Sequence, residues 1–175
     1  MSPGLAFNDL LEYTDWERRD WFAWIPQQDR AVLEISTGPS GDGRFGSIGD
    51  LCRHIFSAEL RYVERLSDRP ITETSTIPSD NLDALFQLSQ QSRLALRGYI
   101  AALPVGDWDQ RVEFNLMNSL LVASPRKIVT HVLIHELRHW AQIATMLRLN
   151  GLKVGFHDLL FSPAMGGEFQ LGHQT

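Results

Sequence analysis

The sequence predicts an all-α protein, a four-helix bundle with a short irregular or hairpin segment before the last helix and a C-terminal tail. Four amphipathic segments of about 20 residues each carry apolar side chains at helical spacing. Their connections are too short to build further layers, which favours a helical bundle. No glycine-rich phosphate loop joins a strand to a helix, which disfavours a nucleotide-binding α/β fold. We expect a single domain over residues 1–175, with its core at about 5–151 and a tail at 152–175.

The first helix is predicted over residues 5–25, ending at Pro26. Its aromatic residues occupy more than one side, which exceeds the apolar surface that one helix of a bundle buries. These residues are Trp16, Trp21, Phe22 and Trp24. Excess apolar surface is typical of an interface, so we expect a homodimer formed by outer helix faces.

The middle of the chain predicts two further helices. A loop from Ser36 to Gly46 is rich in glycine, proline and serine, and no regular element is expected there. The second helix is predicted over residues 47–66. The third is expected to start from an N-cap at Ser79 or Asp80 and to continue to Ile100.

The region before the last helix has the pattern of a hairpin. Residues 112–116 alternate like a short strand and could pair with 120–122 across 117–119. The last helix has Ser124 as its N-cap and Pro125 in its first position, and it stops at Asn150-Gly151. The glycine-rich tail is expected to be a loop that packs on the bundle.

The composition disfavours several classes of protein. The 16 basic and 21 acidic residues give a net charge of −5, which argues against a nucleic-acid partner. The single cysteine, Cys52, excludes a disulfide within the chain and an all-cysteine metal site, and we expect it to be a small buried hydrophobe. The sequence contains no secretion leader and no apolar run of about 18 residues, so we expect a cytoplasmic protein without a membrane partner.

The histidines predict a metal site. His131, His135 and His139 follow one another at intervals of four residues. On a helix such residues form one stripe with neighbouring Cβ atoms about 6 Å apart, so two imidazoles can share a divalent ion. Neutral imidazole binds zinc, nickel, iron and copper. A third ligand must come from another helix, and His54 is the candidate because it lies beside Ile55 in the second helix, where it is expected to point toward the core.

Three stretches of the chain together form a known pattern. They read L-C-R-H-I-F-S-A-E at 51–59 with Y-V-E-R-L at 62–66, H-V-L-I-H-E-L-R-H-W-A-Q-I at 131–143, and L-R-L-N-G at 147–151. In these residues the chain resembles the DinB-like metalloenzyme family, and the resemblance spans nearly all of residues 5–151. Trp140-Ala141 replace an Arg-Gly pair that often stands at this place in the family.

The resemblance implies a set of site residues. The metal ligands would be His54 of the second helix with His135 and His139 of the fourth. His131 matches an upstream family position, which we interpret as a residue that supports the ligands or as a polar core contact. Glu59 matches a recurrent position and would either orient His54 or be a solvated charge. Three nitrogen ligands leave at least one position open to water or substrate, which is typical of a catalytic site.

A second motif predicts a different chemistry. Residues 135–139 read H-E-L-R-H, the H-E-x-x-H signature of zinc metallopeptidases, in which Glu136 would be the general base. The extended form of the signature needs glycine and histidine where this chain has Gln142 and Thr145. A later ligand would lie beyond Gly151 in the tail, the candidates being His157, Asp158 and Glu168. We therefore keep the metallopeptidase as the less favoured alternative, with Glu136 otherwise supporting the metal ligands.

The resemblance also implies a function. Family members suggest a bacterial, damage-inducible homodimer that binds one divalent ion per chain, such as zinc, nickel or iron. The implied activity is a thiol-dependent transferase or isomerase that acts on small electrophiles with a low-molecular-weight thiol such as bacillithiol or mycothiol. The alternative is a metal-binding stress-response protein without turnover.

Overall fold

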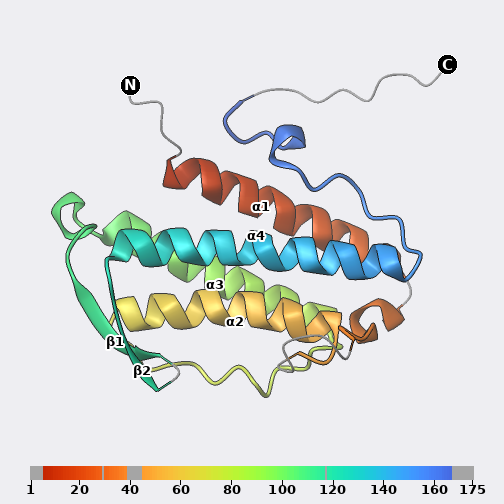
Figure 1. Ribbon diagram of the computed structural model, residues 1–175, viewed down its shortest axis with the longest axis horizontal. Coiled ribbons are helices and arrows are strands. Elements are labelled where there is room, and N and C mark those ends of the chain that lie inside the picture. Colours follow the sequence, from red (N-terminus) through yellow and green to blue (C-terminus); the bar gives the residue numbers. More distant parts are fainter. Residues whose placement is uncertain (1–5, 29, 39–44, 117, 167–175) are drawn as a thin grey trace.

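The computed structural model describes residues 6–28, 30–38, 45–116 and 118–166. Within these ranges the chain is mostly helical, with one small two-stranded sheet. The long helices are α1 (Phe7–Trp24), α2 (Ile48–Leu66), α3 (Leu82–Ala102) and α4 (Pro125–Leu149). They lie lengthwise beside one another (Figure 1), with α2 in contact with α3 and α4, and α1 in contact with α4. No helix in these ranges is long and apolar enough to cross a membrane.

Side chains that accept hydrogen bonds from backbone amides mark where α2 and α4 begin. The Ser124 hydroxyl accepts from the Lys127 amide, and Pro125 occupies the first position of α4, as the sequence predicts. The Ser47 hydroxyl accepts from the Asp50 amide in the same way at the start of α2. The predicted first helix is confirmed as α1 over Phe7–Trp24, with residue 5 outside the described residues, and it passes at Ile25 into a single 3-10 turn containing Pro26.

The predicted N-cap of the third helix is wrong. α3 begins after Asn81, whose side chain accepts a hydrogen bond from the Ala84 amide at 3.0 Å, rather than after Ser79 or Asp80. The reason is a close approach of two backbones: a Cβ atom at Gly49 of α2 would lie 1.9 Å from the Ser79 carbonyl oxygen. The chain therefore has to pass over Gly49 before it can turn into a helix.

The predicted hairpin is confirmed. Strands β1 (Val112–Leu116) and β2 (Ser119–Ala123) pair antiparallel, with Phe114 opposite Leu121. The second strand is longer by one residue at each end than the alternation indicates. Met117 lies outside the described residues, and Asn118 has a φ of 63°, a left-handed conformation that asparagine tolerates well.

The loop before α2 contains more structure than the sequence predicts. A 3-10 turn covers Arg30–Glu34, and Ser36 forms an isolated antiparallel bridge with Ser47. Apart from this isolated bridge, the described residues of the predicted loop form no helix or strand, as the sequence predicts. Residues 39–44 of the predicted loop lie outside the described part of the chain.

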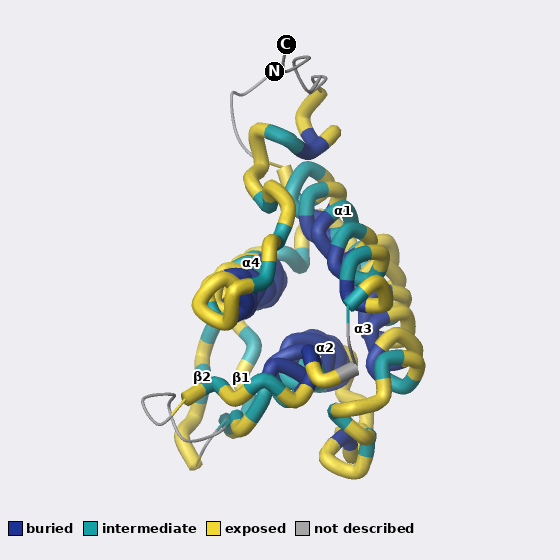
Figure 2. The backbone as a smooth tube through the Cα atoms, turned by 90° about the vertical axis from the view of Figure 1, so that its right-hand side faces the viewer, coloured by how far each residue is buried: buried dark blue, intermediate teal, exposed yellow. Residues whose placement is uncertain are grey.

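A layer of charged side chains lies between two apolar clusters in the core. One cluster includes Trp21, Phe56 and Trp140, and the other includes Leu11, Val63 and Leu133. In α1, α3 and α4 buried polar residues fall between these two sets, and Glu59 of α2 forms ion pairs with two of them; the residues are Arg18 in α1, Ser92 and Arg93 in α3, and Glu136 in α4. Buried residues follow the inner sides of the helices seen end-on (Figure 2). Cys52 is 2% exposed, as expected for a small hydrophobe.

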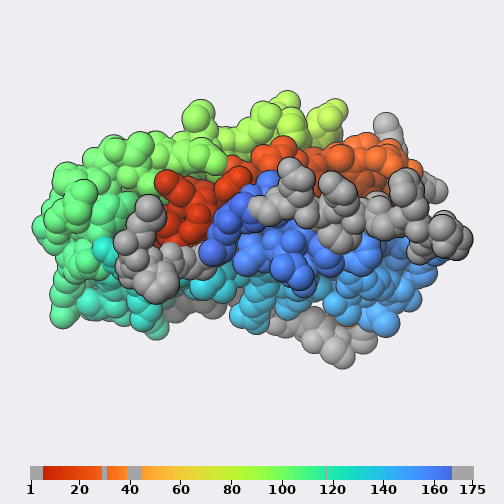
Figure 3. All heavy atoms as spheres, turned by 90° about the horizontal axis from the view of Figure 1, so that it is seen from above, coloured from red at the N-terminus to blue at the C-terminus, as the bar shows by residue number. Residues whose placement is uncertain are grey.

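The segment after α4 packs against α1, as the sequence predicts for the tail. The Tyr13 hydroxyl donates to the His157 carbonyl at 3.0 Å, and the Trp24 indole donates to the Lys153 carbonyl at 3.2 Å. The His157 ring stacks on Trp21 with centroids 4.1 Å apart. From above, this segment lies along α1 (Figure 3). It therefore accounts for aromatic residues of α1 that the sequence assigns to a dimer interface.

Candidate metal centre

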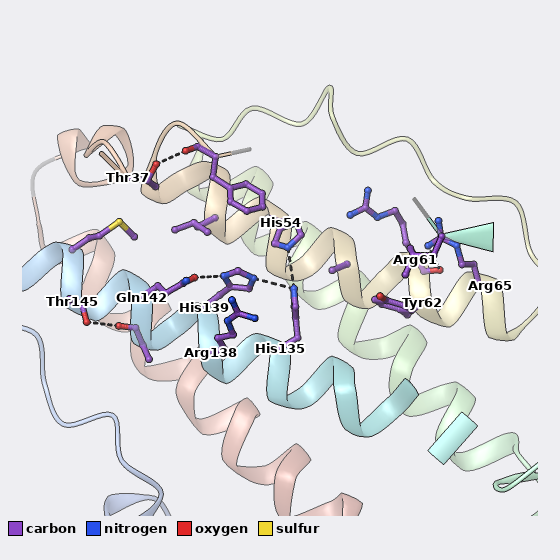
Figure 4. A pocket seen from close by; sticks show the side chains of 16 residues that line it. Thr37, His54, Arg61, Tyr62, Arg65, His135, Arg138, His139, Gln142 and Thr145 are labelled. Carbon is purple, nitrogen blue, oxygen red and sulfur yellow. Dashed lines mark hydrogen bonds between the residues drawn. The ribbon is translucent and has the colours of Figure 1, made fainter. Parts of the chain in front are cut away.

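Three imidazoles from two helices converge at one point. His135 and His139 lie one turn apart on α4, and His54 approaches them from α2 (Figure 4). The Nε2 atom of His135 lies 3.1 Å from Nε2 of His54 and 3.1 Å from Nε2 of His139. The three histidines offer ligand atoms that all lie within 4.8 Å of one another, so they could hold a metal ion. Two nitrogens bound to one tetrahedral zinc are about 3.3 Å apart, given bonds of 2.0–2.1 Å.

The surroundings of His139 and His135 favour the neutral imidazole, which is the form that binds a metal cation. Nδ1 of His139 lies 2.6 Å from Oε1 of Gln142, and a proton donated from Nδ1 to this oxygen corresponds to the neutral tautomer that directs its Nε2 lone pair toward His135. Burial, together with the neighbouring His139 and His54, lowers the pKa of His135 to about 3. His135 is therefore neutral at physiological pH, which is the form of imidazole that binds metals.

The three histidines line a pocket of about 1050 Å³. Phe45 and Leu51 form an apolar wall on one side, and the Phe45 ring lies 4.4 Å from that of His54. His139 is the most buried of the three at 6% exposure, while His54 and His135 are half-buried and reach the pocket. The arrangement combines a cluster of nitrogen ligands with space for a small molecule beside it.

The sequence model of the DinB family matches residues 1–168. The chain belongs to the DinB family. A comparison with curated protein sequences gave no match. The resemblance that the histidine stretches carry is thus confirmed across nearly the whole of this DinB chain.

His131 does not lie in the core of this DinB protein. It is exposed on α4, so the interpretation as a polar core contact is wrong. Its ring lies 5.5 Å from that of His135 and 5.5 Å from that of Tyr62 on α2. His131 therefore flanks the ligand cluster on the side of the β-hairpin.

Glu59 is neither solvated nor placed at the edge of the DinB site. It is 1% exposed, so the interpretation as a solvated charge is wrong. Its carboxylate accepts a hydrogen bond from the Ser92 hydroxyl at 2.8 Å and forms an ion pair with Arg18 at 3.0 Å. These contacts join α2 to α1 and α3 rather than serving His54.

Glu136 belongs to the same charged layer. Its carboxylate accepts from Nε of Arg18 at 2.6 Å, from Arg93 at 2.6 Å and from the Trp140 indole at 3.1 Å. Burial disfavours its ionised form, but the charges of Arg18 and Arg93 prevail and lower its pKa. The carboxylate between His135 and His139 in sequence thus faces α1 and α3, whereas the imidazoles face α2.

Sequence reasoning missed several residues of this site. The pocket arginines Arg61, Arg65 and Arg138 were not singled out, and Gln142 was given no role beside His139. The signal for Gln142 is its place three residues after His139, which puts it on the same helix face. The arginines of α2 carry a similar signal, because Arg61 lies two helical turns after His54.

Proposed function

We propose that this DinB protein is a four-helix bundle metalloenzyme in which His54, His135 and His139 bind one divalent ion, such as zinc, nickel or iron. The observation that carries the proposal is the convergence of three Nε2 atoms at the wall of a pocket of about 1050 Å³. Nε2 of His54 and Nε2 of His139 each lie 3.1 Å from Nε2 of His135. Gln142 supports it by holding the His139 ring in the orientation that presents Nε2.

A catalytic role is supported by what surrounds the ligands. Structural zinc sites are closed by four protein ligands, whereas catalytic sites keep a position for substrate. Here three protein nitrogens face a pocket large enough for a small molecule. When bound, such an ion lowers the pKa of a coordinated thiol and holds it as a thiolate. The residues of this chain would orient the thiol and the electrophile within the pocket, with Phe45 and Leu51 shielding them from water.

The buried contacts of Glu136 argue against the metallopeptidase alternative. A general base has to be free to take a proton from water near the metal. Arg18, Arg93 and Trp140 occupy the Glu136 carboxylate, and its exposure is 1%. We therefore propose a thiol-dependent transferase or isomerase acting on small electrophiles, as the resemblance implies.

Elemental analysis of the purified protein tests the metal site. We expect about one divalent ion per chain in the wild type, none in a His135→Ala, His139→Ala double variant, and a severe loss in His54→Ala. His131→Ala is the matched control. It removes an imidazole from the same stripe of α4 but none of the three converging Nε2 atoms. Full occupancy in the double variant would refute the ligand assignment.

Consumption of an electrophile tests the activity. We expect monochlorobimane to be consumed faster in the presence of metal-loaded protein and a low-molecular-weight thiol, with the rate falling in the double histidine variant. Bacillithiol, mycothiol and cysteine would be compared. Stoichiometric metal without turnover on any thiol would favour the non-catalytic metal-binding alternative, in which the protein takes part in a stress response.

The homodimer and the damage-inducible bacterial origin stay predictions that the family resemblance supports, and the cytoplasmic location stays a prediction from the sequence. The tail that covers Trp21 and Trp24 removes the surface argument for a dimer. Sedimentation equilibrium at micromolar concentration tests it, and a single-chain mass would refute the dimer.

A further inference from the structure

The charge of the pocket is opposite to that of the chain. The sequence has 16 basic and 21 acidic residues, with a net charge of −5. The pocket beside the histidines nevertheless contains the guanidinium groups of Arg61, Arg65 and Arg138, and none of its described lining residues is acidic. A concave surface lined by one sign of charge attracts ligands of the opposite sign.

The three pocket arginines, of which Arg61 and Arg65 are half-buried and Arg138 is exposed, differ in their partners from other arginines of the chain. Arg18 and Arg93 are paired with buried carboxylates, and the exposed Arg126 is paired with Asp109. Within the described part of the chain, no carboxylate oxygen lies within 4.0 Å of a side-chain nitrogen of Arg61, Arg65 or Arg138. Arginine held at a pocket without a carboxylate partner is free to bind an anionic ligand.

Arg61 and Arg65 are held close together. Both are half-buried, and the Arg65 guanidinium donates to the Arg61 carbonyl at 3.4 Å and lies 5.7 Å from the Phe114 ring of β1. Burial and then the charge of Arg65 lower the pKa of Arg61, and the more distant charges of Glu73 and Glu64 only partly oppose this. Two like charges one turn apart repel each other, and a bound anion would relieve that repulsion.

The arginines stand at a defined place relative to the metal ligands. His54, Ala58, Arg61 and Arg65 all line the pocket from α2. At 1.5 Å per residue, Arg61 and Arg65 are about 10 and 16 Å beyond His54 along the helix axis. Arg138 lies on α4 between His135 and His139 in sequence (Figure 4). One elongated small molecule can therefore meet the histidines and the arginine pair at the same time.

We propose that the pocket binds a small anionic molecule whose carboxylate or phosphate group is held by Arg61 and Arg65, with Arg138 adding charge beside the histidines. This anion site rests on the proposed function, and the anionic molecule would be the substrate or the thiol of that reaction. Carboxylate and phosphate groups each present two oxygens that can accept a pair of parallel hydrogen bonds from one guanidinium group.

Isothermal titration calorimetry with succinate and with inorganic phosphate tests this proposal on metal-free and zinc-loaded protein. We expect at least one of the two anions to bind the metal-free wild type, and the affinity to fall about tenfold or more in Arg61→Gln and in Arg65→Gln, because each loses a charge-assisted hydrogen-bond donor. Arg148→Gln is the matched control: it removes the same charge from the exposed end of α4, away from the pocket.

Each outcome decides for or against the arginine site. A loss of anion affinity confined to Arg61→Gln and Arg65→Gln supports the arginine site. Whether succinate or phosphate binds then shows whether the ligand group is a carboxylate or a phosphate. Equal loss in Arg148→Gln, or binding by neither anion, overturns the arginine site. Binding that requires zinc and is unchanged in Arg61→Gln and Arg65→Gln would place the anion at the histidines and also overturn it, while leaving the metal site intact. Zinc content measured in the same samples shows separately whether the proposed function fails.

Discussion

Replacing Glu136 by glutamine removes the negative charge that joins α1, α3 and α4, and it separates the two chemistries that the H-E-x-x-H motif suggests. The Glu136 carboxylate accepts two hydrogen bonds from Arg18, at 2.6 and 2.8 Å, and one from Arg93 at 2.6 Å. In Glu136→Gln both buried arginines would keep their charges and share Glu59 as the remaining fully buried carboxylate near them. We expect the variant to lose stability and keep its metal.

The size of the loss follows from the burial of these charges. Arg18 is 5% exposed and Glu136 is 1% exposed, so water cannot replace the lost partner. Breaking a buried ion pair from one side costs about 3–5 kcal/mol, mainly because a charge stays buried without its partner. For a domain of this size about 1 kcal/mol lowers the melting temperature by 2–4 °C, so we expect a fall of about 6–20 °C.

Thermal unfolding followed by circular dichroism, with zinc content measured on the same samples, tests this expectation. Glu12→Gln, on the exposed side of α1, is the control and should leave both quantities unchanged. Adding Arg18→Gln to Glu136→Gln should recover part of the loss, because it removes one unpaired charge. An unchanged melting temperature combined with metal-dependent peptide cleavage that disappears in Glu136→Gln would refute the reasoning and identify Glu136 as a general base.

Three further predictions concern the ligands, pH and the tail. Gln142→Ala should weaken zinc binding about 10- to 100-fold by releasing the His139 ring, as measured by competition with a chelator, whereas Thr145→Ala on the same pocket wall should not. The lowered pKa of Glu136 means that its ionised form stabilises the fold above the ordinary glutamate pKa of about 4.3, and that this contribution is lost as pH falls through the folded-state value. Urea unfolding at pH 7 and pH 3 should therefore show the difference between wild type and Glu136→Gln narrowing in acid, and a constant difference would contradict this. His157→Ala should cost about 1–3 kcal/mol and expose the tail to limited proteolysis, because it removes the ring stacked on Trp21 and the contact of Nδ1 with Glu17 at 3.0 Å; unchanged proteolysis would refute the docking role.

Local signals in the sequence were sufficient for the helices, the hairpin and the histidine pair of α4, whereas the approach of His54 depends on how α2 packs against α4. Ser124 and Pro125 specify the start of α4 through their own backbone chemistry, and the four-residue spacing of His135 and His139 presets two ligands on any helix. The same locality explains the error at Asn81, since the position of that cap depends on Gly49 of another helix.

Only the tertiary structure decided what Glu136, Glu59 and the aromatic residues of α1 contact. Glu136 stands between His135 and His139 in sequence, but its partner Arg18 is 118 residues away. Trp21 is covered by His157 from beyond the last helix. Pairings at such separations depend on how helices pack, because a buried charge takes whichever opposite charge the fold brings within hydrogen-bond distance. The periodicity of one segment carries no information about that partner.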